Sequence, residues 1–360
     1  MTPHERRQKI IELVMMDEEY ERRRCKEDFT HFCEAWCQIE KKVAGEDGGS
    51  IPFRLWPAQR AVIPDLLTAM MLIILKARQL GLTWLCAAYC LWLITFYPGK
   101  LVVVVSAIED WAVEFIDRMR FIRQRLPAMF SVDLEKDGAQ HIRVVHSRKA
   151  DGSVLDYSEV KSLATTLAGA QGKTPDVMIM DETSRNRYAA SIFGSSWPGI
   201  EKAGGRIIVI SNSHKDGVGW GWTRSIYRAS MAGLNQWTRI FLPWWACPER
   251  LTDAEAAAME RDPSVVPVDF RERMLATGYD EVKFSENYPE SESEAVSAAI
   301  GSYFGKILLR HSHPLQGHVG NLIPSRDRKD VEFQRRDDGL LEIWRYPYRL
   351  VDGYDGRPWT

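Results

Sequence analysis

The sequence predicts an α/β fold in which a mostly parallel β-sheet lies between helices. Three apolar runs, beginning near Met71, Val177 and Arg206, predict buried strands of this sheet, and each run stops at polar residues. Runs that are apolar at nearly every position are typical of parallel strands, which are covered on both faces. An open α/β sheet binds its ligands beyond the carboxyl ends of such strands. The polar residues that follow the three runs are therefore the candidate site.

The first run continues through LIILKARQLGLT, Leu72 to Thr83, which predicts a strand, a glycine-bearing loop and a helix N-terminus. Loop amides and the unpaired N–H groups of a helix N-terminus bind phosphate. The usual phosphate-loop pattern is GxxxxGK[ST]. Gly81 and Thr83 match its second glycine and its hydroxyl, whereas Leu82 replaces the lysine and Lys76 replaces the first glycine. An ordinary strand–turn–helix is the alternative interpretation.

The second run, VMIM, leads directly into Asp181 and Glu182. Mg²⁺ takes oxygen ligands and gives up its hydration shell reluctantly, so we expect Asp181 to hold the metal through water. We expect Glu182 to polarise an attacking water molecule. A pair of surface acids that caps the next helix is the alternative. The position of the pair, about a hundred residues after the phosphate-loop-like turn, favours the metal site.

The third run, RIIVI, ends in Ser211, Asn212 and Ser213, whose small polar side chains can hydrogen-bond a phosphate, a water molecule or Glu182. With these three stretches in this order, the chain resembles the large terminase subunit of tailed bacteriophages, the motor that pumps DNA into the procapsid. KARQLGLT resembles a deviant Walker A motif, VMIMDE a Walker B motif and SNS the coupling motif. FRLWPAQ upstream and ENYPESESEAV downstream extend the resemblance from about Phe53 to Tyr348.

The resemblance implies a P-loop NTPase fold of the ASCE or RecA-like type, with N-terminal helices and a C-terminal linker subdomain. It implies a helical segment at 1–50, an ATPase domain at 51–283 and, at 284–360, a linker region leading towards a nuclease. The nuclease domain of the family is missing from this sequence, so we expect no nuclease activity and regard the chain as part of a longer protein.

The resemblance also implies the roles of individual residues. Lys76 or Arg78 would neutralise the β- and γ-phosphates of ATP; some terminases carry their lysine at the start of the loop, as Lys76 does here. Thr83 and Asp181 would hold Mg²⁺. The implied nucleotide-binding residues together are Trp56, Gln59, Lys76, Ala77, Arg78, Gln79, Leu80, Gly81, Leu82, Thr83, Ser211, Asn212 and Ser213.

Two further roles follow from the same resemblance. Gln59, with Phe53 or Trp56 beside it, would read the adenine through its amide, although Pro57 could equally mark an ordinary surface helix. The family's arginine that acts on a neighbouring subunit would stand about eleven residues before Glu182, and Gln171 occupies that position. Lys173 could serve instead as a third catalytic residue beside Glu182 and Arg78, or could merely face solvent.

The partners implied are double-stranded DNA, the portal protein of the procapsid, a small terminase subunit and further copies of the chain in a ring on the portal. The implied location is the cytoplasm of the host cell. The net charge of −2 over 360 residues provides no global basic field, so any DNA contact must be a local patch. A candidate patch for DNA or for a neighbouring subunit contains four arginines near the end of one predicted helix: Arg118, Arg120, Arg123 and Arg125. A solvated helix face is an equally good interpretation of these charges.

Six cysteines with no paired CxxC motif indicate reduced thiols rather than disulfides or zinc. Cys33 and Cys37 with His31 lack a fourth metal ligand, so we expect them to pack in a helix. No apolar run reaches the ~18 residues of a membrane span.

Two other functions remain possible from the sequence. A P-loop-like scaffold that does not hydrolyse ATP is suggested by Leu82, although Thr83 and Asp181–Glu182 argue against it. A superfamily 2 helicase or translocase shares the upstream glutamine and the DE pair. Such an enzyme needs arginine motifs in a second RecA-like lobe, and the sequence after Ser213 has no second nucleotide-fold pattern.

Overall fold

The computed structural model describes residues 3–41, 49–164 and 174–297, and three later strands at 318–324, 331–335 and 341–343. The chain divides into two compact units, Met1–Ala299 and Ile300–Thr360. The first unit extends past residue 283, where the sequence analysis ended the ATPase domain. That three-part division remains a prediction.

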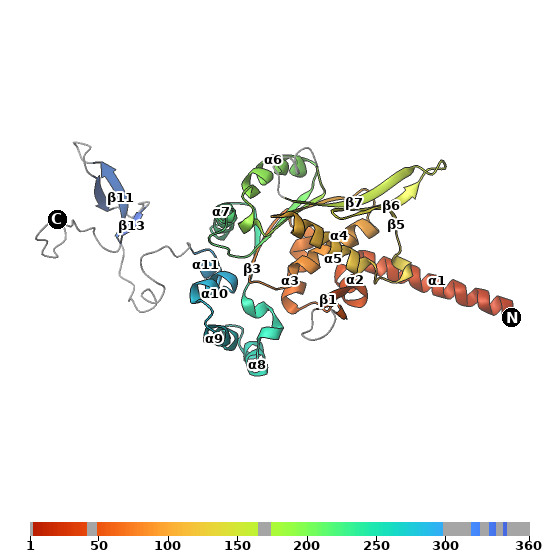
Figure 1. Ribbon diagram of the computed structural model, residues 1–360, viewed down its shortest axis with the longest axis horizontal. Coiled ribbons are helices and arrows are strands. Elements are labelled where there is room, and N and C mark those ends of the chain that lie inside the picture. The colour runs from red at the N-terminus through yellow and green to blue at the C-terminus, as the bar shows by residue number, and fades with distance from the viewer. Residues whose placement is uncertain are drawn as a thin grey trace, which may run out of the picture. The chain divides into compact units, whose positions relative to one another are not determined.

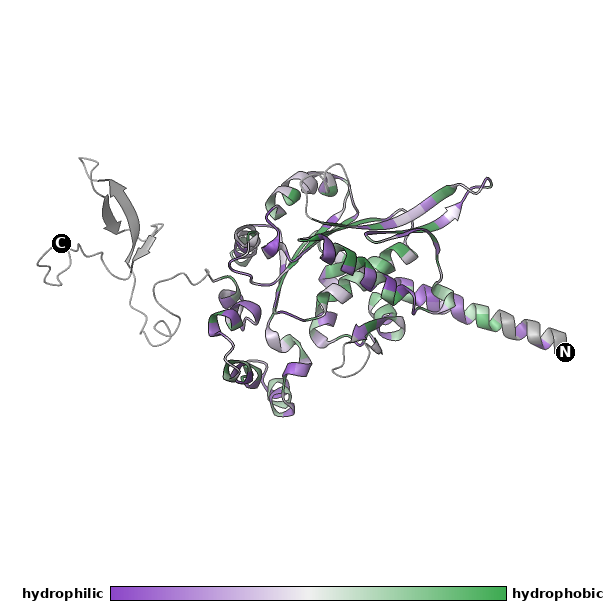
Figure 2. Cartoon of the chain, in the orientation of Figure 1, coloured by the Kyte–Doolittle hydropathy of each residue, from purple (hydrophilic) through white to green (hydrophobic). Residues whose placement is uncertain are grey.

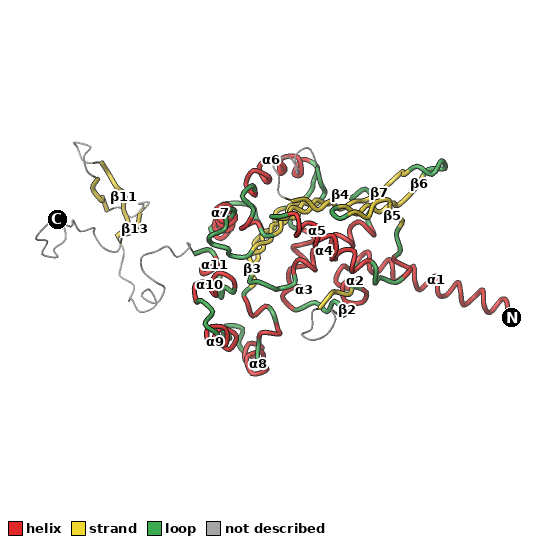
Figure 3. Tube along the Cα trace, viewed as in Figure 1, coloured by secondary structure: helices red, strands yellow, loops and turns green. Residues whose placement is uncertain are grey.

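An eight-stranded sheet forms the centre of the first unit, in the order β10-β3-β9-β8-β4-β7-β6-β5. The strands from β10 to β7 are parallel, whereas β6 and β5 continue the sheet antiparallel. Figure 3 shows the strands of this sheet in yellow. The bounds are β3 Met71–Lys76, β4 Leu101–Ser106, β5 Asp133–Gly138, β6 His141–Arg148, β7 Val154–Ala164, β8 Val177–Asp181, β9 Arg206–Ser211 and β10 Thr238–Leu242. The predicted mostly parallel sheet is confirmed.

Helices cover both faces of this sheet, with α4 and α5 on one side and α6 and α7 on the other (Figure 1). Their bounds are α1 Pro3–Glu27, α2 Phe29–Trp36, α3 Pro57–Thr68, α4 Leu82–Phe96, α5 Glu109–Arg123, α6 Ala189–Lys202 and α7 Trp220–Met231. After β10 come α8 Asp253–Arg261, α9 Asp269–Ala276, α10 Glu281–Asn287 and α11 Glu292–Ala295. Short 3₁₀ helices are η1 Ala128–Phe130, η2 Thr183–Arg185, η3 Trp244–Ala246 and η4 Pro248–Arg250.

Side chains of β3 alternate between two apolar cores, as the two-residue period of a strand requires. Leu72 and Ile74 face the larger core, which α4 fills, while Ile73 and Leu75 face the core beneath α6 and α7. Hydrophobic residues along α4 are visible in Figure 2. Because β3 is buried on both faces, the end of the strand and the loop after it are fixed in position.

The N-terminal helices α1 and α2 confirm the helical start of the chain, and α1 projects away from the rest of its unit (Figure 1). A hairpin of β1 Gln38–Lys41 and β2 Gly49–Pro52 follows them. None of the described helices combines the length and the apolar character needed to cross a membrane. In the second unit, β11 His318–Pro324 pairs antiparallel with β12 Val331–Arg335 and β13 Leu341–Ile343.

Candidate functional site: three strand ends around one cavity

The loop between β3 and α4 has the geometry of a phosphate cradle. Gly81 takes the left-handed φ of 68° just before α4 begins, a conformation that favours glycine. A Cβ atom at this position would also lie 2.6 Å from Nε2 of Gln59. The N–H groups of Gly81, Leu82 and Thr83 donate no hydrogen bond to the described residues. These unpaired donors at the N-terminus of a 15-residue helix create a site for an anion.

Lys76, the last residue of β3, points across the neighbouring strand β9 to the end of β8. Its side chain is only 7% exposed, and Nζ lies 3.1 Å from Oε1 of Glu182. A buried ammonium needs such a partner, because its desolvation is costly. Lys76, predicted to bind phosphate, and Glu182, predicted to polarise water, are therefore directly paired.

Asp181 and Glu182 each keep a buried carboxylate oxygen without a hydrogen-bond partner, Oδ1 of Asp181 and Oε2 of Glu182. Burial raises the pKa of Asp181 to about 6; the charge of Glu182 acts in the same direction, while Lys76 and Arg118 oppose it. Glu182 also has a left-handed φ of 51°, which is uncommon for a residue other than glycine. Unsatisfied oxygens together with backbone strain are typical of a functional site.

The end of β9 adds a third set of polar groups. Ser211 accepts a hydrogen bond from the Ser184 N–H at 3.0 Å and donates to its own neighbour, the carbonyl of Asn212. Oδ1 of Asn212 and Oγ of Ser213 are buried and have no partner. Since Ser184 lies just beyond Glu182, Ser211 joins the end of β9 to the turn that follows the two acids.

A cavity of about 190 Å³ lies where these strand ends meet. Five predicted residues line it, namely Arg78, Thr83, Asp181, Glu182 and Asn212. The structure therefore brings the predicted phosphate, metal and water-activating groups together. Four lining residues were not predicted: Trp111, Glu114, Arg118 and Arg185.

The unpredicted residues bring aromatic rings and positive charge to the cavity. Arg118 lies over the Trp84 ring at 5.6 Å and contacts Glu114 at 2.7 Å. Arg185 lies over Trp111 at 6.0 Å. Trp111, Glu114 and Arg118 are spaced three and four residues apart, which places them on one face of α5. That spacing was the available signal.

The four arginines predicted as a patch on α5 do not form one continuous basic surface. Arg118 points to the cavity, while Arg120 and Arg123 both pair with Asp137 on β5. Arg125 lies over Phe121, its Cζ 3.4 Å from the ring centre. The helix packs against the antiparallel extension of the sheet, and one acid from that extension, Asp137, pairs with two of the four arginines.

Gln59 lies beside a second cavity of about 450 Å³, which Phe53, Trp56, Gly81 and Trp84 also line. Its Oε1 accepts from the Trp56 N–H at 3.0 Å, and its Nε2 donates to the Leu80 carbonyl at 2.9 Å. Both ends of the amide are thus bonded to the chain, and the adenine-reading role remains a prediction. Gln171 and Lys173 lie outside the described residues.

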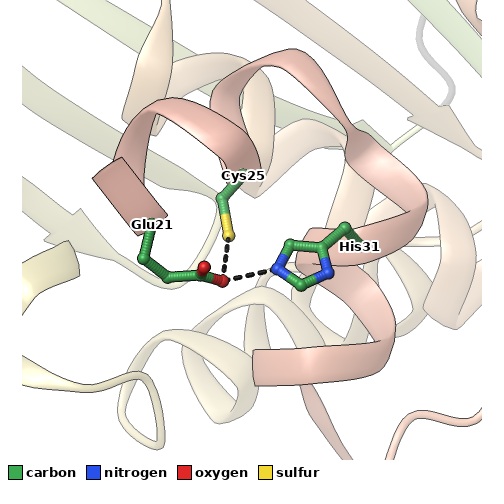
Figure 4. Close-up of side chains that lie close together, drawn as sticks. All are labelled: Glu21, Cys25 and His31. Carbon is green, nitrogen blue, oxygen red and sulfur yellow. Dashed lines mark hydrogen bonds and ion pairs between the residues drawn. The ribbon is translucent and has the colours of Figure 1, made fainter. Parts of the chain in front are cut away.

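A separate cluster joins α1 to α2, where Glu21, Cys25 and His31 approach one another (Figure 4). Glu21 Oε1 contacts the His31 ring and accepts hydrogen bonds from Cys25 Sγ and Trp36 Nε1. The carboxylate is therefore satisfied by the protein itself. Cys33 on α2 and Cys37, the extended residue that follows the helix, are both buried in the apolar core.

Residues 73–230 match a family model described as "Terminase large subunit, T4likevirus-type, N-terminal". The match begins within β3 and ends within α7, so it contains all three strand ends of the site. Gln59 lies outside it. No curated protein matches the chain.

Several solved structures are similar to the chain. The ATPase domain of the Thermus phage P74-26 large terminase is 17% identical with a TM-score of 0.48, over 66% of this chain and 93% of that one. The HK97 bacteriophage large terminase is 17% identical with a TM-score of 0.49, over 88% and 66%. A large terminase from a thermophilic bacteriophage, in complex with ADP, is 11% identical with a TM-score of 0.41, over 61% and 52%.

Proposed function

We propose that this chain, which belongs to the terminase large-subunit family through residues 73–230, hydrolyses ATP to drive the packaging of double-stranded DNA. One observation carries the proposal. Thr83, at the start of α4 where N–H groups are unpaired, lines the same cavity as two carboxylates with unsatisfied buried oxygens. An anion bound at the first feature and a cation bound at the second would satisfy both. Mg²⁺ bound to ATP has these two charges.

The oxygen atoms at the cavity fit Mg²⁺. Thr83 supplies a hydroxyl and Asp181 a carboxylate oxygen without a partner, and Mg²⁺ prefers oxygen ligands and retained waters. Bound there, the metal would neutralise charge on the β- and γ-phosphates. A cation at Asp181 would also remove the cost of its desolvated negative charge.

Phosphoryl transfer asks the protein mainly for positioning and for stabilisation of charge. The loop amides and the Lys76 ammonium would hold the phosphates, which makes Leu82 at the usual lysine position compatible with ATP binding. Arg78 would stabilise the γ-phosphate in the transition state, since its planar guanidinium matches phosphate oxygens. Arg118 and Arg185 add positive charge to the same cavity.

Glu182 would accept a proton from the attacking water. In the structure Lys76 contacts its Oε1, while Oε2 has no partner. An incoming γ-phosphate competes for the Lys76 ammonium, and this exchange would leave Glu182 able to accept the proton. Ser211 accepts a hydrogen bond from Ser184, two residues beyond Glu182, and through it the segment Ser211–Ser213 would respond to the loss of the γ-phosphate.

The proposed partners are double-stranded DNA, a portal protein on the procapsid, a small terminase subunit and further copies of the chain in a ring. The proposed location is the host cytoplasm, with transient attachment to the portal. Lys173 is proposed to act on the neighbouring subunit's nucleotide. Turnover per subunit should then rise with protein concentration, and Lys173→Ala should lose that rise while binding ATP normally; unchanged concentration dependence would exclude the role.

A steady-state ATPase assay of the purified chain, with and without double-stranded DNA, tests the proposal. Mg²⁺-dependent turnover that DNA stimulates is the expected result. Nucleotide binding without turnover would identify the scaffold function instead. Separation of DNA strands coupled to turnover would identify the helicase.

A further inference from the structure

A buried arginine lies directly behind the phosphate loop. Arg250 ends the short helix η4, and only 7% of its surface is exposed. Its guanidinium lies beside two aromatic rings, with Cζ 5.1 Å from the centre of Phe270 and 5.0 Å from that of Tyr288. Phe270 belongs to α9, and Tyr288 follows α10 directly. Arg250 lies outside the segment that matches the terminase family model.

Backbone carbonyls are the hydrogen-bond partners of this guanidinium. Nη1 donates to the Trp244 carbonyl at 3.1 Å, and Nη2 donates to the Arg78 carbonyl at 2.8 Å. Nη2 also lies 3.4 Å from Oε1 of Gln79. Arg250 forms no salt bridge with a carboxylate among the described residues, and burial lowers its pKa. A buried charge is costly unless hydrogen bonds compensate for its desolvation, so the carbonyl partners of Arg250 are needed to hold it there.

The bond to Arg78 fixes the direction of one peptide unit. In a trans peptide the C=O of one residue and the N–H of the next point in opposite directions. Because Arg250 draws the Arg78 carbonyl to the back of the loop, the Gln79 N–H must point to the front. Gln79 has a left-handed φ of 60°, a conformation that is unfavourable for residues other than glycine. The bond from Arg250 compensates for this strained conformation.

A second bond attaches the same loop to α10. The Arg78 N–H donates to the Asn287 carbonyl at 2.9 Å, one residue before Tyr288. Arg250 and Asn287 thus hold the two sides of Arg78. Both depend on the aromatic contacts among Phe270, Phe284 and Tyr288, whose ring centres are 5.3–6.0 Å apart.

We propose that Arg250 is a positioning residue of the phosphate loop, which turns the Gln79 N–H towards the nucleotide phosphates and makes tight nucleotide binding depend on the docking of α9 and α10. The proposal rests on the ATPase function for its ligand, though not for the loop geometry. Arg250 acts through the loop backbone and is not itself assigned to the reacting atoms.

Hydrogen exchange of the nucleotide-free chain tests the geometry directly. Arg250→Met keeps an apolar side chain beside the two rings but removes every donor. Amides of residues 76–83 should then exchange at least tenfold faster than in the wild-type chain. Arg271→Met is the matched control, since Arg271 lies 5.9 Å from the Phe284 ring and pairs with Glu281 and Glu290 without contacting the loop. Its loop amides should exchange at the wild-type rate.

Calorimetric titration with Mg²⁺ and a slowly hydrolysed ATP analogue tests the consequence. Arg250→Met should raise Kd about tenfold, or about 1.4 kcal/mol. Arg250→Lys retains a charge and one donor direction but lacks the planar fork, so its Kd should rise about threefold. Should Arg250→Met fail to fold, Arg250→Lys carries both measurements.

Wild-type loop exchange and wild-type affinity in folded Arg250 variants would overturn the proposal. Equal effects in Arg271→Met would also overturn it, because the aromatic cluster alone would then be responsible. A wild-type chain that binds no nucleotide would refute the proposed ATPase function, whereas hydrogen exchange would still decide the role of Arg250.

Discussion

Two carboxylates on the same sheet differ in how the protein treats them. Glu159 on β7 is 5% exposed and contacts the cationic side chains of Arg143 and Lys161 and the ring of His141. Although burial opposes it, these partners lower the pKa of Glu159 to about 2. Asp181 on β8 has an orphaned buried oxygen, and its pKa is raised to about 6. The carboxylate of Glu159 is fully paired within the protein, whereas one oxygen of Asp181 has no hydrogen-bond partner among the described residues.

The position of each residue explains this difference. Glu159 lies at the junction with the antiparallel strands, where β6 presents side chains directly opposite those of β7. Asp181 is the last residue of a parallel strand, and beyond it lie only loops and helix ends. Strand pairing therefore stabilises one acid and leaves the other available for a ligand.

The largest expected effect belongs to Glu182. Glu182→Gln should retain nucleotide binding and lower turnover by about 10²–10⁴-fold, because the amide cannot accept a proton from water. Single-turnover ATPase assays and analogue titration measure the two quantities separately. Normal turnover in this variant would make Glu182 a bystander.

The next effect separates the two cations of the loop. Lys76→Ala should weaken nucleotide binding by about 1.5–3 kcal/mol, the range for a hydrogen bond to a charged group. Arg78→Ala should act mainly on kcat, because its guanidinium is expected to serve the transition state. Titration of both variants with a fluorescent ATP analogue checks this, and reversed effects would exchange the two roles.

Removing the paired carboxylate of Glu159 should destabilise the fold. Glu159→Gln should lower the free energy of unfolding by about 1–2 kcal/mol at pH 7, less than the full pKa displacement implies, because water partly screens the pairs. The folded pKa is depressed, so the wild-type contribution exists above about pH 4.5 and is lost as the pH falls towards 2. Urea titration should find wild type and variant converging over that interval.

Removing the unpaired carboxylate charge of Asp181 should have the opposite effect on stability, and a smaller one. The raised pKa of Asp181 means that the folded state binds more protons than the unfolded state between about pH 3.8 and 6, so its contribution to stability falls as the pH rises through that window. In EDTA at pH 7.5, Asp181→Asn should therefore be about 1 kcal/mol more stable than wild type. A destabilised Asp181→Asn protein would mean that the carboxylate is satisfied after all.

The sequence predicted the parts of the site that lie at the ends of apolar strands. Lys76, Asp181 and Ser211 each follow a continuous buried run, and a run of this kind fixes its own position in a parallel sheet. The four arginines of α5 were predicted as one patch, but Arg118 lines the cavity while Arg120 and Arg123 pair with Asp137. The pairing depends on how β5 returns to the sheet, which the sequence of α5 does not encode.

Contacts between distant segments could not be predicted in this way. Arg250 meets Arg78 across 172 positions, and no local pattern connects them. Gln59 was predicted near the loop, but the bond from its amide to Leu80 follows from the packing of α3 rather than from spacing. Residues whose partners are set by helix packing thus became apparent only in the structure.

The six cysteines of the chain are all buried, and none forms a disulfide. Burial raises the pKa of Cys25, Cys33, Cys86, Cys90 and Cys247, which suppresses the reactive thiolate. The native chain therefore resembles a cysteine-free background for maleimide chemistry. One cysteine could be introduced on α8 and a second in the exposed turn at residues 149–153 between β6 and β7, to carry donor and acceptor dyes. Single-molecule fluorescence could then follow nucleotide-dependent motion without removal of any native thiol.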